Sequence, residues 1–178
     1  VVKKVEVTDY VSPAPIFCED SAYAYVAEQC AFGPRVMNSA AHDSCGEYIA
    51  QKFKSFGAVV YDQYADSKLY TGTPIKMRNI VASYNPEAAA RILIAGHWDS
   101  RQWADNDPDE RNHNTPIDGA NDGASGVGVL MELARAISTQ PLDVAVDFVF
   151  FDIEDQGVPD WADTYKDDRE VVEHRRDD

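Results

Sequence analysis

The chain is poor in basic residues, has few cysteines and contains no long apolar run. It has 16 lysines and arginines against 31 aspartates and glutamates, which gives a formal net charge of −15 over 178 residues. This shortage of positive charge argues against a nucleic-acid partner, because binding the phosphate backbone requires a basic face. No apolar stretch approaches the ~20 residues that a membrane-spanning helix needs. A membrane partner is therefore not expected either.

The three cysteines, Cys18, Cys30 and Cys45, do not form a CxxC pattern. A zinc site built from thiolates is therefore not expected. Spacing alone does not decide whether Cys18–Cys30 or Cys30–Cys45 is a disulfide, and we favour buried or free thiols. The N-terminal VVKKVEV lacks the apolar core of a signal peptide, which leaves the compartment open.

The acidic residues are concentrated in two stretches. Residues 97–122 contain seven acids and two bases, residues 152–178 contain eleven acids and four bases, and the first 96 residues are nearly neutral. An acidic cluster inside a fold is typical of bound cations, whereas an acidic terminus is usually only solvated. The length and the 44% hydrophobic content predict one globular domain over residues 1–159, with an N-terminal arm over 1–20 and a charged tail over 160–178.

The pattern of apolar residues predicts an α/β fold. It indicates helices over residues 21–30 and 40–56, the second capped by Asn38 or Ser39; β structure over 58–84; a buried central strand over 91–96; a helix opening at Asp122 or Ser125 and ending before Pro141; and a buried strand over 144–151. The last three elements form a strand–helix–strand crossover, which predicts parallel strands.

Chemically reactive side chains follow both strands of this crossover. His97 and Asp99 come after the first strand, Glu154 and Asp155 come after the second, and Asp122 lies in the glycine-rich turn before the helix. The carboxyl ends of parallel strands meet at one edge of a sheet, where ligands bind. Each residue alone could be a hydrogen-bonded core histidine, a turn aspartate or a helix cap. Together they predict a zinc site in which a further carboxylate moves protons.

Three segments of the sequence resemble zinc-dependent exopeptidases. They are GHWDSR at residues 96–101, PIDGANDGASGVGVLMELAR at 116–135 and FVFFDIEDQG at 148–157. That family includes bacterial aminopeptidases and glutaminyl cyclases, and the resemblance, over residues 32–159, is strongest to the bacterial glutaminyl cyclase-like members. It implies a three-layer α/β/α fold around a mixed, mostly parallel sheet of the phosphorylase/hydrolase-like kind.

The resemblance also implies roles for particular residues. By position, Asp122 and Asp155 resemble metal ligands, Glu154 resembles the general acid/base, and Asp99 would orient its neighbours. His97 resembles a ligand of the second metal in the aminopeptidases. Because the cyclases keep a similar His-x-Asp sequence while binding one zinc, whether His97 is a ligand stays open. Trp98 and Trp103 flank the expected pocket and could either line a substrate site or pack in the core.

Three hypotheses for function follow from the resemblance. The first is a zinc-dependent glutaminyl-peptide cyclotransferase that converts N-terminal glutamine to pyroglutamate and releases ammonia. The second is a zinc-dependent aminopeptidase; both act on peptide N-termini. The third is a catalytically incomplete, non-enzymatic chain.

The third hypothesis arises because the family has a further histidine ligand and another aspartate on later strands. Nothing after Pro159 resembles those strands, and His174, in the charged tail, is not expected to replace that ligand. We therefore expect the chain to cover the N-terminal part of the family's fold. The resemblance suggests a periplasmic or secreted protein and leaves the oligomeric state open.

Overall fold

The computed structural model describes residues 15–140, 142–159 and 161–162. Its elements, in chain order, are α1 (Glu19–Cys30), α2 (Ala40–Ser55), β1 (Val59–Lys68), β2 (Pro74–Tyr84), β3 (Arg91–His97), α3 (Gly126–Ile137) and β4 (Ala145–Phe151). A short 3-10 helix (Glu110–Asn112) and a π-helical turn (Ala120–Ser125) lie between β3 and α3. Every helix and strand expected from the sequence over these residues is present.

The four strands form one mixed sheet in the order β1-β2-β4-β3. β3 and β4 are parallel, and α3 connects them, so the α/β class and the crossover are confirmed. The expectation of a mostly parallel sheet is wrong for the described strands. β1 pairs antiparallel with β2, and β2 pairs antiparallel with β4. β1 and β2 are joined by a short connection, so they form an antiparallel hairpin. β2 of this hairpin runs antiparallel to β4.

The run over residues 91–96 was expected to be a buried central strand, and this expectation is also wrong. β3 lies at the edge of the described sheet, and Ile92 and Leu93 are 50% and 65% exposed. The central, buried strand of the crossover is β4, where Phe148 and Phe150 have no exposed surface. An apolar β-branched run shows that a strand can be buried, but it does not show which elements cover it.

Residues next to its two ends determine where α2 begins and ends. The Ser39 side chain accepts a hydrogen bond from the His42 amide at 3.1 Å, which caps the N-terminus of α2 as expected. Gly57, just past the other end of α2, has φ of +87°, a left-handed conformation that favours glycine at this position. Ser39 and Gly57 therefore set the length of α2 and its exit toward β1.

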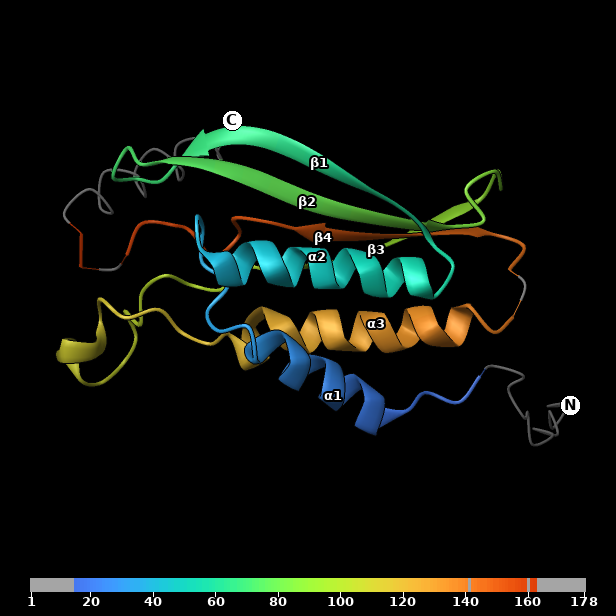
Figure 1. The fold of residues 1–178 in the computed structure, drawn as a ribbon, viewed down its shortest axis with the longest axis horizontal. Coiled ribbons are helices and arrows are strands. Elements are labelled where there is room, and N and C mark those ends of the chain that lie inside the picture. The colour runs from blue at the N-terminus through green and yellow to red at the C-terminus, as the bar shows by residue number, and fades with distance from the viewer. Residues whose placement is uncertain (1–14, 141, 160, 163–178) are drawn as a thin grey trace, which may run out of the picture.

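The core lies between the sheet and two helices. α2 and α3 pack on one face of the sheet, and α1 packs on α3 (Figure 1). The Phe53 ring of α2 lies 5.2 Å from the Phe148 ring and 5.0 Å from the Phe150 ring. Met131 of α3 is buried in the same cluster. This packing fixes the helices relative to β4 and so positions the segments that leave the carboxyl end of the sheet.

The described helices cover only one face of the sheet (Figure 1). The other face exposes apolar side chains, among them Val59 at 57%, Tyr61 at 51% and Leu93 at 65%. Within the described residues the fold therefore has two of the three expected layers. Cys18, Cys30 and Cys45 are free thiols. No helix in the described part of the chain is long and apolar enough to cross a membrane.

Candidate metal site

The expected site residues meet at the carboxyl end of β3 and β4. His97 is the last residue of β3 and lies in register with Phe151, the last residue of β4. Glu154 and Asp155 follow in the turn after β4, and Asp122 lies in the π-helical turn that leads into α3. Segments far apart in the sequence thus converge at the edge where an α/β sheet binds its ligands.

The His97 imidazole lies among three carboxylates. Its Nε2 is 2.7 Å from Asp122 Oδ1, and its Nδ1 is 3.4 Å from Asp99 Oδ1 and 3.7 Å from Glu154 Oε2. The hydrogen bond to Asp99, followed by that to Asp122, raises the pKa of His97 to about 9. In the metal-free chain the imidazole is therefore charged at neutral pH. A metal ion that binds His97 must first displace a proton.

Asp155 provides an oxygen that lacks a partner. Its Oδ2 is buried and accepts no hydrogen bond from the described residues. Burial, and next the charges of Asp122 and Asp99, raise the pKa of Asp155 to about 6. A buried carboxylate oxygen without a donor is costly, and a cation would satisfy it.

The donor set fits zinc. One ligand atom each from His97, Glu154 and Asp155 lies within 4.8 Å of the others, and Asp122 contacts His97 from the other side. One imidazole and several carboxylates are ligands that Zn²⁺ accepts. The other described histidines lie outside this cluster: His42 pairs with Asp152, and His113 stacks on Trp161. His174 lies outside the described residues.

Asp99 connects the two strands that carry the site. It has no exposed surface, and its Oδ2 accepts hydrogen bonds from the Asp155 amide at 3.1 Å and from Gln156 Nε2 at 3.0 Å. Its other oxygen faces His97. The proposed role of Asp99 in orienting its neighbours stays a prediction, and these contacts support it.

Two glycines allow Asp122 to approach His97. A Cβ at Gly123 would lie 2.6 Å from His97 Nε2 and 2.6 Å from the His97 carbonyl oxygen. Gly119 has φ of +56°, and a Cβ there would lie 2.4 Å from the Asp122 carbonyl oxygen. Any side chain at either position would push the turn away from β3. The glycines are therefore needed for Asp122 to lie within hydrogen-bond distance of His97.

A pocket opens beside the site. Its lining includes Arg101, Trp103, Asp105, Asp122 and Asp155. Trp103 is nearly buried, and its ring packs edge-on against Tyr70 at 5.4 Å and Trp161 at 6.2 Å. Trp103 thus lines this pocket, and its role in a substrate site stays a prediction.

Trp98 takes the other role left open by the sequence, that of a packing residue. It is fully buried, its ring stacks on His42 at 4.3 Å, and its Nε1 donates to the Arg78 carbonyl at 3.2 Å. It does not reach the pocket because it points from the end of β3 into the core, while the residues on either side of it point toward the site.

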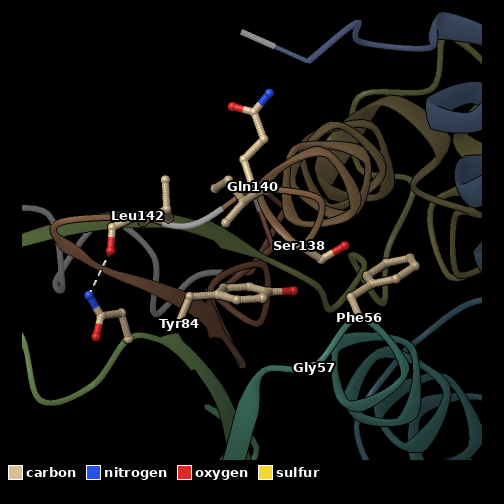
Figure 2. A pocket seen from close by; sticks show the side chains of 8 residues that line it. Phe56, Gly57, Tyr84, Ser138, Gln140 and Leu142 are labelled. Carbon is tan, nitrogen blue, oxygen red and sulfur yellow. Dashed lines mark hydrogen bonds between the residues drawn. The ribbon is translucent and has the colours of Figure 1, made fainter.

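A second pocket lies at the opposite end of the sheet, near the start of β4 (Figure 2). Phe56, Tyr84, Ser138 and Leu142 belong to its lining, which contains no histidine, cysteine, aspartate or glutamate. The buried Tyr84 hydroxyl finds no partner among the described residues, and burial raises its pKa to about 12. Without metal ligands or proton-transfer groups, this pocket is not a candidate for the chemistry.

The sequence did not reveal a buried histidine–aspartate contact directly behind the site. His42 Nε2 lies 2.9 Å from Asp152 Oδ1, and both side chains are buried. Asp152 also accepts from the Arg78 amide at 2.8 Å and stands two residues before Glu154. The available signals were a histidine at helical spacing from the apolar Cys45, and an aspartate that ends the apolar run of β4.

Comparison with known proteins identifies the family. The model of peptidase family M28 matches residues 79–166, which include all the site residues above. The matched residues make up just under half of the chain. Two solved structures agree: a glutaminyl cyclase of Bacteroides thetaiotaomicron is 53% identical with a TM-score of 0.82, and a Zn-dependent exopeptidase of Parabacteroides distasonis is 52% identical with a TM-score of 0.82. The family resemblance seen in the sequence is thereby confirmed.

The chain spans about half the length of those two solved structures. Each match covers 84% of this chain and 51% of the solved chain. A curated relative, the protein YfbL of Escherichia coli, is 39% identical over 61% of this chain and 31% of its own length. Cyclases and exopeptidases both occur among the relatives, so the comparison gives the family and leaves two activities to be separated.

Proposed function

We propose that this chain carries the zinc site of an enzyme that acts on peptide N-termini, and that its reaction is glutaminyl cyclisation. The observation that carries the proposal is the partnerless buried oxygen of Asp155 beside His97 and Asp122. It supports a bound cation at this edge of the sheet. The cyclase and Zn-dependent exopeptidase among the relatives support zinc and peptide substrates.

His97, Asp122 and Asp155 would hold the zinc ion. When bound, zinc supplies a Lewis acid that polarises the substrate carbonyl. Glu154 is left for proton transfer, because its side chain is 60% exposed and remains within 3.7 Å of His97. Trp103 would bound the space in which the substrate side chain lies.

In the cyclisation the α-amine nitrogen of the glutamine attacks its side-chain amide carbon. A carbon–nitrogen bond forms there, and the bond from that carbon to the amide nitrogen breaks. Glu154 accepts a proton from the α-amine and donates it to the departing nitrogen, which leaves as ammonia. The carboxylate therefore begins and ends the cycle ionised, and no other reactant is required.

Aminopeptidase activity is the second candidate. His97 supports it, since His97 and Asp155 have ligand atoms within 4.8 Å of one another and could together hold a second metal ion. Glu154 would then take a proton from the water whose oxygen bonds to the first peptide carbonyl carbon, and would donate it to the amine nitrogen that leaves as the carbon–nitrogen bond breaks. The two candidates share residues and differ in the bond broken and in the number of metal ions.

A peptide that begins with glutamine separates the candidates. The 178-residue chain, supplied with zinc, is incubated with this peptide and the products are identified by mass spectrometry. Cyclisation gives a pyroglutamyl peptide and ammonia, whereas an aminopeptidase gives free glutamine and a shortened peptide. Metal analysis adds a second criterion, since one zinc ion per chain favours the cyclase and two favour the peptidase.

Two variants act as controls. Glu154→Gln removes the proton carrier and is expected to abolish turnover while zinc stays bound. Glu87→Gln is the matched control, because Glu87 is an exposed acid in the connection between β2 and β3, at the other end of the sheet. Neither product, together with no zinc bound to the wild-type chain, would instead support the non-enzymatic hypothesis.

A further inference from the structure

A buried arginine lies beneath the candidate metal site. Arg35 has no exposed surface and lies in the connection between α1 and α2. Its guanidinium donates to three backbone carbonyls: Nε to Trp98 at 3.1 Å, Nη1 to Asp118 at 2.6 Å and Nη2 to Gly119 at 2.9 Å. Among the described residues no ion pair joins Arg35 to a carboxylate. In the described part of the chain, the hydrogen bonds of its guanidinium therefore all go to backbone carbonyls.

The three carbonyls belong to the two segments that carry the site. Trp98 stands between His97 and Asp99 at the end of β3, and Gly119 stands three residues before Asp122. The fork of Arg35 thus joins the histidine segment to the aspartate turn. Burying a positive charge away from water costs free energy. Packing alone therefore does not explain why an arginine stands at this position.

Ser100 closes the same junction on the other side of Arg35. The Arg35 amide donates to Ser100 Oγ at 2.9 Å, and the Ser100 amide donates to the Arg35 carbonyl at 3.2 Å. Ser100 Oγ in turn donates to the Ile117 carbonyl at 3.1 Å. The backbone and the side chain of Arg35 therefore both contribute to a fixed distance between residues 98–100 and residues 117–119.

We propose that Arg35 is a positioning residue for zinc: it sets the distance between His97 and Asp122. This inference rests on the proposed function, since it concerns the same metal site. A planar guanidinium can reach three separate carbonyls in fixed directions, whereas an ammonium is a single point with rotatable donors. Arg35→Lys keeps the charge and loses the fixed directions, and the two ligand segments are then no longer held in register.

The test compares zinc affinity in two arginine variants of the 178-residue chain. Arg78→Lys is the matched control, because the Arg78 guanidinium is also largely buried but binds Asp62 and Glu47, which belong to neither site segment. Zinc dissociation constants are measured by competition with a chromogenic chelator, and urea unfolding confirms that each variant is folded under those conditions. Loss of a residue that orients metal ligands typically weakens binding ~10–100-fold.

We expect Arg35→Lys to weaken zinc binding ~10-fold or more and Arg78→Lys to leave it within about twofold, even where the two variants lose similar stability. Equal losses of affinity in both variants, or no loss in Arg35→Lys, would overturn the positioning role. Affinity that follows unfolding stability across both variants would show a merely structural effect.

A second readout separates this inference from the proposed function. Amide hydrogen exchange is compared in the metal-free chains. The inference predicts faster exchange confined to residues 97–100 and 117–124 in Arg35→Lys and unchanged exchange there in Arg78→Lys. If the wild-type chain binds no zinc, the proposed function fails, and this exchange pattern alone decides whether Arg35 holds the two segments. Uniformly faster exchange, or none, overturns the inference.

Discussion

Both faces of the sheet carry large apolar side chains, and the surroundings of the two faces are opposite. On the inner face Ile80 and Phe148 have no exposed surface, whereas on the outer face Tyr61 is 51% and Leu93 is 65% exposed. The difference arises from the elements above each face, since α2 and α3 pack on the inner face and no described helix covers the outer one (Figure 1). Apolar composition therefore does not show by itself which face contributes stability.

The largest difference between the faces is expected from truncating one apolar side chain on each. Phe53→Ala removes a ring packed on Phe148 and Phe150, and such a cavity costs about 3–5 kcal/mol of unfolding free energy. Leu93→Ala on the outer face should cost less than about 1 kcal/mol, because the side chain is already solvated. Urea unfolding of both variants measures the two values. Similar losses would show that the outer face is also packed.

A smaller effect is expected at the boundary between the inner face and the site. His42→Ala leaves the buried Asp152 carboxylate without its imidazole partner, although the Arg78 and Ile153 amides still donate to it. The expected loss is about 1.5–3 kcal/mol of unfolding free energy, the range for hydrogen bonds to charged groups. His42→Gln retains a donor and should recover part of this loss. A loss below about 0.5 kcal/mol in His42→Ala would contradict the role assigned to the pair.

Local signals explain why much of this molecule could be predicted from its sequence. The capping serine at Ser39, the crossover around α3 and the placing of Asp122, Glu154 and Asp155 at one edge all depend on short stretches of chain. The parallel pairing of β3 with β4 then follows from the crossover. Site residues at strand ends were thus the most predictable part of the fold.

What the sequence did not reveal depends on partners that are distant in the chain. The edge position of β3 follows from β2 pairing with β4, a long-range contact without a local signal. Arg35 binds backbone carbonyls, which every residue offers, so no complementary side chain marks its site in the sequence. His42 finds Asp152 110 positions away. Buried polar contacts of this kind are visible only once the fold is known.

The site edge should also differ from both faces in its response to pH when metal is absent. The Asp155 pKa is raised from 3.8 to about 6, so the folded chain retains a proton that the unfolded chain has lost, and stability falls as pH rises from about 4 to 6. The His97 pKa is raised from 6.5 to about 9, so its contribution is present below 6.5 and is lost as pH rises through about 9.

Urea unfolding of the metal-free chain across this pH range checks both groups. Asp155→Asn should flatten the fall between pH 4 and 6. His97→Gln should flatten the upper range and, because the His97 charge lowers the pKa of Asp155, should also extend the lower fall to higher pH. Leu93→Ala, on the outer face, should leave both ranges as in the wild type. If the unfolding free energy of Asp155→Asn still fell between pH 4 and 6, another group would have to titrate in that range.

The smallest effect is expected when a charge is added to the outer face. Leu93→Lys places an ammonium on a solvated position in register with Asp147, so its unfolding free energy should change by less than about 0.5 kcal/mol. Ile80→Lys puts the same group under the helices, where an unpaired charge cannot stay solvated, and should prevent folding. Circular dichroism and urea unfolding compare the two. If Leu93→Lys also lost its fold, apolar contacts on the outer face would have to be part of the stabilising core, because solvent alone tolerates a lysine.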